Sequence, residues 1–115
     1  MNNKEFVDYV VHDLMAEIPG VTARAMFGGY GLYKNGAIFA IIIDGELYMK
    51  VDDALQKKYE AAGSKPFTYD RDGKPCSMRY WILPPDVMAN RELLAQWVSW
   101  SCGLPKTIKS LKKRV

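Results

Sequence analysis

The spacing of apolar residues divides the chain into a helical beginning, a central group of strands and a helical end. In the first twenty residues, apolar positions recur every three to four residues, which is the period of an amphipathic helix. These positions are Phe6, Val7, Val10, Val11, Leu14, Met15 and Ile18. Asn2 or Asn3 can cap the start of this helix, and Pro19-Gly20 is expected to end it.

From Val21 the apolar period changes to two, which is the period of a β-strand. Residues 21–27 alternate and therefore predict a half-buried strand. The dipeptides Asn35-Gly36 and Asp44-Gly45 are typical of two-residue hairpin turns, so antiparallel pairing is expected. Residues 37–43 are apolar throughout, which predicts a strand covered on both faces. Residues 30–34, 37–43 and 46–51 are predicted to form a three-strand meander, which the strand over 21–27 precedes.

The second half of the chain predicts two further helices around a second pair of extended segments. Asp52 is a suitable N-cap for a short helix over 53–62, and Gly63 suits its C-terminal end. Residues 66–70 are expected to be extended and residues 71–74 to form a turn. A strand is predicted over 76–82, broken by prolines.

The last predicted helix runs from a cap at Asn90 to about Ser101, and Gly103-Leu104-Pro105 stops it. Its apolar stripe includes Cys102, for which a packing role is expected. Because the strands are grouped rather than alternating with helices, the pattern predicts an α+β fold. Its antiparallel sheet has about five or six strands, with helices at the N-terminus, in the middle and at the C-terminus.

The composition is that of one ordinary globular domain. Of the 115 residues, 49% are hydrophobic and 25% are charged. The longest apolar run, residues 37–43, is too short for a membrane helix, which needs about 20 residues. The N-terminus lacks the pattern of a signal peptide, so a cytoplasmic location without membrane association is expected.

The net charge of +3 is concentrated at the C-terminus. Residues 106–115 carry five basic side chains and no acidic one, which leaves eleven basic and thirteen acidic residues in 1–105. The chain is therefore divided into a domain over 1–105 and a basic tail over 106–115. Such a tail can bind nucleic acid weakly through phosphate contacts alone. The candidate phosphate contacts are Lys106, Lys109, Lys112, Lys113 and Arg114.

Catalytic, metal and cofactor sites are not predicted. His12 is the single histidine and is expected at a solvated rim, and Cys76 and Cys102 are far apart in sequence. A zinc site needs more ligands than these. The serines lack a nucleophile-elbow context, and the carboxylates of Asp70, Asp72 and Asp86 fall where turns are expected. The chain is accordingly predicted not to be an enzyme.

The glycine-rich segment Met26–Tyr33 allows two interpretations. Glycine-rich backbone can bind phosphate, but a phosphate loop is normally followed by a helix. Here a strand and a hairpin turn follow, which favours a bent or bulged strand. An alternative remains open: a small-ligand or enzymatic module whose groove lies near Gly28–Gly31, with Arg24 or Arg79 anchoring an anion.

The aromatic content favours protein interaction. Seven Tyr, four Phe and three Trp are more than a domain of this size can bury completely, and exposed aromatic residues are typical interface anchors. Five are expected in the core: Phe6, Phe27, Phe39, Trp81 and Trp97. The candidate interaction surface consists of Tyr30, Tyr33, Tyr69 and Trp100, serving a homodimer or a protein partner.

An ordered set of short segments resembles the N-terminal domain of the TfoX/Sxy family of bacterial regulators of natural competence. Together the segments span roughly residues 5–100, in the family's order and spacing. They are Arg24–Tyr33, Leu47–Asp52, Lys65–Tyr69, Tyr80–Asp86 and Leu93–Val98.

The resemblance implies helices packed on a curved antiparallel sheet and a regulatory, non-enzymatic role without cofactor. It also implies a transcription regulator as partner, because members help the cyclic-AMP receptor protein at some promoters. Competence regulators carry a second, helical domain, whereas this sequence ends soon after Pro105. A stand-alone N-terminal domain that does not itself activate competence genes is therefore expected.

Overall fold

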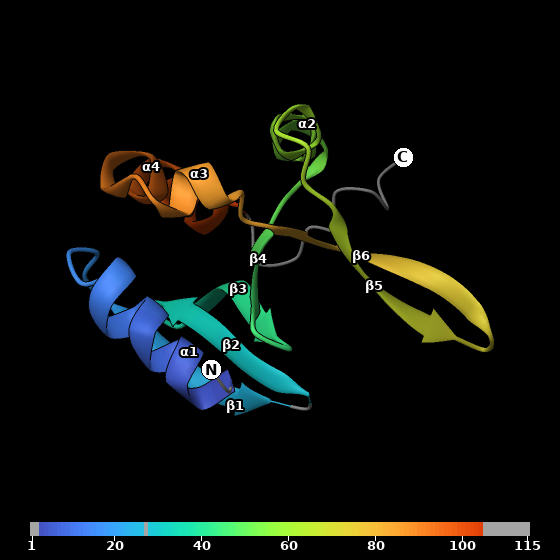
Figure 1. The fold of residues 1–115 in the computed structure, drawn as a ribbon, viewed down its shortest axis with the longest axis horizontal. Coiled ribbons are helices and arrows are strands. Elements are labelled where there is room, and N and C mark those ends of the chain that lie inside the picture. Colours follow the sequence, from blue (N-terminus) through green and yellow to red (C-terminus); the bar gives the residue numbers. More distant parts are fainter. Residues whose placement is uncertain (1–2, 27, 105–115) are drawn as a thin grey trace.

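The structure is a computed structural model that describes residues 3–26 and 28–104, with the backbone alone described for residues 3, 69–71 and 74–78. Four α-helices, one π-helical turn and six strands make up this part of the chain. In order they are α1 (Asn3–Tyr9), η1 (Val10–Leu14), β1 (Val21–Met26), β2 (Gly29–Lys34), β3 (Ala37–Ile43), β4 (Glu46–Lys50), α2 (Asp53–Ala61), β5 (Pro66–Arg71), β6 (Lys74–Ile82), α3 (Pro85–Met88) and α4 (Arg91–Cys102) (Figure 1).

The six strands form one antiparallel sheet in the order β1-β2-β3-β4-β6-β5, which confirms the predicted α+β class. The three-strand meander that the hairpin turns predicted is present as β2, β3 and β4, and β1 extends it by one strand through its pairing with β2. Asn35 and Gly36, at φ values of 53° and 86°, adopt the left-handed conformation that such turns require. The last two strands lie in the sheet in the reverse of their sequence order: β6 pairs with β4, and β5 lies at the edge.

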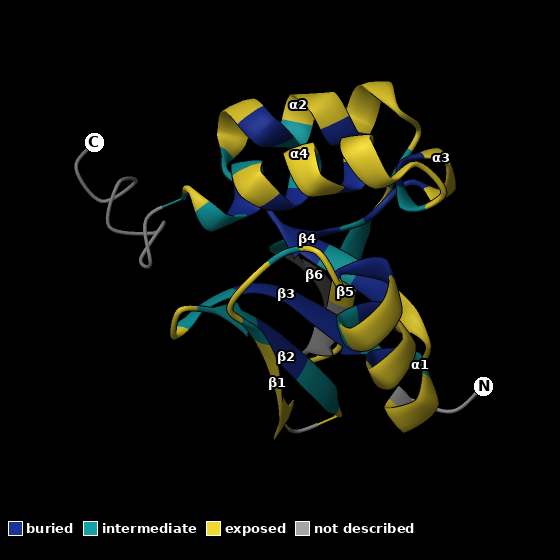
Figure 2. Cartoon of the chain, turned by 90° about the vertical axis from the view of Figure 1, so that its left-hand side faces the viewer, coloured by how far each residue is buried: buried dark blue, intermediate teal, exposed yellow. Residues whose placement is uncertain are grey.

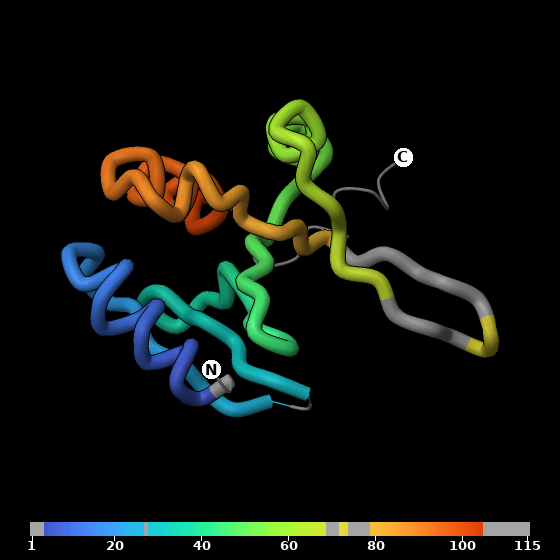
Figure 3. Tube along the Cα trace, in the orientation of Figure 1, coloured from blue at the N-terminus to red at the C-terminus, as the bar shows by residue number. Residues whose placement is uncertain are grey.

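Helices cover the sheet in two groups. Helix α1 packs on β2 and β3, and α4 packs on β3 and β4. Figure 2 shows α2 and α4 side by side as a layer above the sheet, with α1 beside the β1–β2 end. The trace in Figure 3 returns from η1 through a short loop into β1. Within the described residues, no helix has the length and apolar character needed to cross a membrane.

The core lies between these helices and one face of the sheet. Leu32, Ala40 and Met49 occupy aligned positions on β2, β3 and β4 and are buried. Helices α1, α2 and α4 contribute buried side chains opposite them: Val7, Leu55, Tyr59, Leu94 and Val98. Each large apolar side chain buried in this way stabilises the fold by about 1.5–3 kcal/mol relative to exposure.

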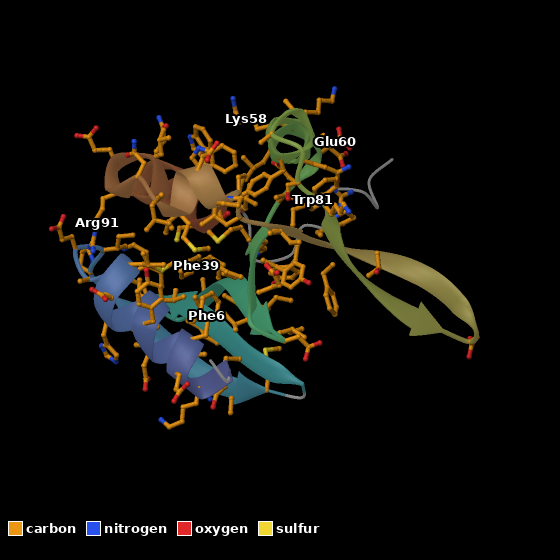
Figure 4. All side chains as sticks on the ribbon, in the orientation of Figure 1. Phe6, Phe39, Lys58, Glu60, Trp81 and Arg91 are labelled. Atoms are coloured by element: carbon orange, nitrogen blue, oxygen red, sulfur yellow. The ribbon has the colours of Figure 1, made fainter. Side chains whose placement is uncertain are left out.

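The predicted core aromatic residues divide into three groups. Phe39 and Trp81 are buried, as predicted, and point inward in Figure 4. Phe6 and Trp97 are half-buried and pack against the core. Phe27 lies outside the described residues.

The first helix is shorter than the apolar stripe predicted. Regular α-helix ends at Tyr9, and a wider π-helical turn follows to Leu14, so the prediction of one helix to Pro19 was wrong. The widened turn is closed by a 2.8 Å bond from the Met15 N–H to the Val10 carbonyl. Leu14 and Met15, which follow in the predicted apolar stripe, are both buried.

Strand β1 is far more exposed than predicted. Val21 is half-buried and residues 22–26 are exposed, so the expectation of a half-buried strand was wrong. The cause is its place at the edge of the sheet, where only β2 flanks it. Alternation in sequence distinguishes the two faces of a strand, but it does not reveal whether a neighbouring strand covers its side.

The glycine-rich segment is tight backbone at the tip of the β1–β2 hairpin. Gly28 has a φ of +85°, and a Cβ on Gly29 would lie 2.0 Å from the carbonyl oxygen of Ile42 on β3. The close approach that the sequence predicted is therefore present at Gly29. The register irregularity lies further along, between Leu32 and Tyr33, rather than at the glycines.

Helices α2 and α4 begin at the residues that the sequence predicted. The Asp52 carboxylate accepts a 2.8 Å bond from the Leu55 N–H, and Asn90 accepts from the N–H groups of Glu92 and Leu93. Helix α2 ends at Ala61, one residue early. The prolines that end β6 open a short helix, α3, which was not predicted. Cys102 is half-buried against the core, in agreement with its predicted packing role.

Candidate interaction surfaces

A mostly apolar pocket of about 240 Å³ opens between α2 and the end of α4. Two adjacent turns of α2 supply one wall, and the last residues of α4 supply the other. We call this feature the α2–α4 pocket, and its lining residues are Asp52, Ala54, Leu55, Lys58, Trp100 and Leu104. The carboxylate of Asp52 caps α2, and Lys58 is an exposed residue at the rim of the pocket.

A series of aromatic rings connects the core to the rim of this pocket. Tyr59 is fully buried and contacts Trp97 edge-on, with ring centroids 4.7 Å apart. Trp97 in turn contacts Trp100 at 5.5 Å. The ammonium group of Lys58 lies 5.0 Å from the centroid of the Trp100 ring, a distance at which a cation–π attraction acts. Figure 4 shows Lys58 on the outer side of α2. Trp100 is therefore packed between Trp97 and Lys58, and it is half-buried, so part of its surface stays accessible.

Polar groups beneath the pocket are buried. Ser101 donates a 2.8 Å hydrogen bond to the backbone carbonyl of Lys50. The Tyr59 hydroxyl has no hydrogen bond of ordinary geometry, and its burial raises the pKa of the phenol well above 10. The neighbouring Ser101 hydroxyl offsets that rise in the pKa only slightly. Burial also lowers the pKa of Lys50.

A second groove, of about 380 Å³, runs between α1 and the edge strand β1. We call it the α1–β1 groove. Its walls combine apolar residues with a few charged or titratable ones on α1 and η1, among them the exposed His12. The lining residues are Lys4, Val7, Asp8, Val11, His12, Val21, Thr22, Ala23 and Tyr30. No sequence pattern predicted this groove, because it depends on β1 being an edge strand.

The candidate aromatic residues from the sequence fall on different surfaces. Tyr30 lines the α1–β1 groove, and Trp100 lines the α2–α4 pocket. Tyr33 lies on the other face of β2, where the Arg24 guanidinium is 5.7 Å from its ring centroid. The Tyr69 side chain lies outside the described part. The structure thus does not gather Tyr30, Tyr33 and Trp100 into a single patch.

Of the two arginines proposed for anion binding, Arg24 lies directly opposite Gly31 on the neighbouring strand, with its guanidinium near the Tyr33 ring. Arg79 is separated from the glycines: on β6 it hydrogen-bonds and ion-pairs with Asp53, whereas Gly28–Gly31 lies at the β1–β2 hairpin. Strands β3 and β4 lie between them. The basic residues Lys106, Lys109, Lys112, Lys113 and Arg114 are outside the described residues. In the part of the chain that is described, no three His, Cys, Asp or Glu side chains gather closely enough to hold a metal ion.

Fold and surfaces together define a small α+β domain whose accessible hollows include the α2–α4 pocket beside Trp100 and the α1–β1 groove. The model of the TfoX N-terminal domain family matches residues 13–103, so the chain belongs to this family. Protein Sxy of Escherichia coli (strain K12) is 23% identical over 107 residues, which is 90% of this chain and 50% of that protein. DNA transformation protein TfoX1 of Aliivibrio fischeri (strain ATCC 700601 / ES114) is 29% identical over 58 residues, which is 50% of this chain and 28% of that protein. The chain thus spans half or less of each of these relatives.

Proposed function

We propose that this chain is a non-enzymatic regulatory domain that acts in transcription by contacting a protein regulator through the α2–α4 pocket. Membership of the TfoX N-terminal domain family supports the regulatory role, as does the similarity to a protein named for DNA transformation. The observation that carries the proposed site is the half-buried Trp100 beside an open apolar pocket. Tryptophan is the residue type most enriched among the energetically dominant contacts of protein interfaces.

The pocket suggests the chemistry of the partner segment. An apolar side chain such as Leu, Met or Phe fills a cavity of this size and contacts the Trp100 ring. An acidic residue beside it pairs with Lys58, whose ammonium group already lies over that ring. The Trp100 ring packs against Trp97, which itself packs against the buried Tyr59. Because these contacts already restrict Trp100, little side-chain entropy is lost when the partner binds.

Site-specific cross-linking in bacterial cells tests this proposal. A photoreactive side chain is placed at Ala54, which lines the pocket, or at Ala95, an exposed alanine on α4 outside it. We expect the Ala54 position to cross-link a transcription regulator that the Ala95 position does not. Equal products at both positions would contradict the proposed site.

A pair of charge reversals links the contact to function. Lys58→Glu should reduce both the cross-link at Ala54 and the change in transcript levels that the domain causes. Lys57→Glu makes the same charge change one residue away, on an exposed residue that is not among those lining the pocket. If the two variants behave alike, the pocket does not mediate the function.

A further inference from the structure

Strand β1 presents an open sheet edge. It is the terminal strand of the sheet, and within the described residues only β2 pairs with it. Residues 22–26 are exposed, and Figure 2 shows this strand coloured mainly as exposed at the outer side of the sheet. An edge of this kind is a template for pairing with another strand.

The hairpin geometry identifies which backbone groups point outward. The Asn35 N–H donates a hydrogen bond to the Gly20 carbonyl, so these two residues form a hydrogen-bonded pair directly before the pair Val21–Lys34. Hydrogen-bonded pairs alternate along an antiparallel ladder. The N–H and C=O groups of Thr22 and Arg24 consequently point toward β2. Those of the intervening residues, Val21, Ala23 and Ala25, point away from the sheet.

Of the features that normally prevent pairing, this edge carries one charged side chain, Arg24, and lacks the others. β1 contains no proline and no lysine, and its register with β2 is unbroken over all six residues. The opposite edge differs, because β5 begins with Pro66 and its pairing with β6 has a register shift. On the helix-facing side β1 carries only the small side chains of Val21, Ala23 and Ala25, next to the open α1–β1 groove.

We propose that β1 pairs antiparallel with β1 of a second copy of this chain, centred on Ala23, to form a two-fold dimer with a continuous sheet. In this register Ala23 faces Ala23 of the second copy, and Val21 faces Ala25 of the second copy. All these residues have outward backbone groups, so the two strands exchange a complete set of hydrogen bonds.

Charge selects this register over its neighbour. Centring on Ala23 places Arg24 opposite Thr22 of the second copy, which suits a guanidinium and a hydroxyl. Centring on Arg24 would place two guanidinium groups directly opposite each other, which is unfavourable. The strand is thus complementary to itself, and a second copy is the occupant that the edge fits. This inference does not depend on the proposed role of the α2–α4 pocket.

A charge-swap series measured by sedimentation equilibrium on the full chain tests the proposal. Each Thr22–Arg24 contact occurs twice in the dimer. Thr22→Arg should raise the dimer dissociation constant by roughly 2- to 30-fold, because both contacts become repulsive. Thr22→Glu should lower that constant by a similar factor. The double variant T22R/R24E should restore dimerisation, because each arginine then faces a glutamate.

A backbone variant and a fold control complete the test. Ala23→Pro removes an outward N–H without removing a bond to β2, and it should weaken the dimer strongly. Circular dichroism and thermal unfolding verify that each variant is folded. A chain that stays monomeric at millimolar concentration would overturn the proposal, whatever other protein binds it. So would a dimer that is insensitive to Ala23→Pro, or one that T22R/R24E does not restore relative to T22R.

Discussion

The hydroxyl of Ser101 on α4 donates a 2.8 Å hydrogen bond to the backbone carbonyl of Lys50 at the end of β4. Both residues are buried, with 1% and 6% of their surfaces exposed, so water is not available to replace this bond. It ties the last helix to the centre of the sheet beside Tyr59 and beneath Trp100. The position of α4, which supplies one wall of the α2–α4 pocket, therefore depends on a polar contact within an apolar core.

Replacing Ser101 with alanine should destabilise the fold by about 1 kcal/mol, because the buried Lys50 carbonyl loses the hydrogen bond that the Ser101 hydroxyl donates. Urea unfolding followed by tryptophan fluorescence measures this change. Ser99→Ala, at an exposed position on the same helix, should stay within about 0.5 kcal/mol of the wild type. Equal effects of the two substitutions would show that the Ser101 bond contributes nothing.

Tyr59→Phe should leave the stability at neutral pH unchanged or raise it by up to about 1 kcal/mol, because it removes a buried hydroxyl without an ordinary hydrogen bond. The effect of this substitution on the free energy of unfolding is larger at alkaline pH. The folded state keeps the Tyr59 proton, since burial raises the pKa of this phenol, whereas the unfolded chain releases it near pH 10. The unfolded state then binds fewer protons, so the free energy of unfolding falls above pH 10.

The Tyr59 contribution to this fall is about 1.4 kcal/mol per pH unit, and the phenylalanine variant should lack it. Denaturant unfolding at several pH values between 8 and 11.5 measures the difference from the wild type. Tyr80→Phe is a useful comparison, because burial also raises the pKa of Tyr80, followed in size by the effect of Tyr33. A wild-type-like alkaline decline in Tyr59→Phe would contradict the assignment.

Two adjacent glycines should respond to alanine for different reasons. Gly29→Ala places a Cβ 2.0 Å from the Ile42 carbonyl oxygen, so β2 and β3 must separate, at a cost of about 3 kcal/mol or more. Gly28 has no atom within 4 Å of the equivalent position, and only its φ of +85° is unfavourable for alanine. Gly28→Ala should therefore cost about 1–2 kcal/mol, and Gly28→Asn less. Thermal unfolding distinguishes the two mechanisms, and the reverse order would be inconsistent with the hairpin described.

The cap of α4 provides a further quantitative test. Asn90 accepts hydrogen bonds of 3.0 and 3.1 Å from the N–H groups of Glu92 and Leu93. Asn90→Ala should cost about 1 kcal/mol, whereas Asn90→Asp retains an acceptor and should cost less. Amide hydrogen exchange in the first turn of α4 should increase in the alanine variant alone. An unchanged exchange rate would mean that this side chain does not stabilise the helix end.

Local chemistry explains why much of the fold was predictable. Asn35-Gly36 and Asp44-Gly45 formed the expected turns because left-handed backbone is tolerated by few residue types, and the meander follows from those turns. Asp52 and Asn90 capped helices for a similarly local reason, since a short polar side chain reaches a backbone N–H only three positions ahead. The grouping of the surface aromatic candidates was less predictable. Tyr30 lines the α1–β1 groove and Trp100 lines the α2–α4 pocket, so the two do not share a surface.

The sequence by itself thus determined the α+β class, the order of the strands and of helices α1, α2 and α4, the two Asx-Gly turns, the caps of α2 and α4, and the family. Only the tertiary structure decided that β6 pairs with β4, that β1 remains an open edge, and that Lys58 meets Trp100. The physical reason is distance along the chain: the Ser101–Lys50 bond joins residues 51 positions apart. Contacts of that separation depend on how whole elements pack, which neither residue type nor local period specifies.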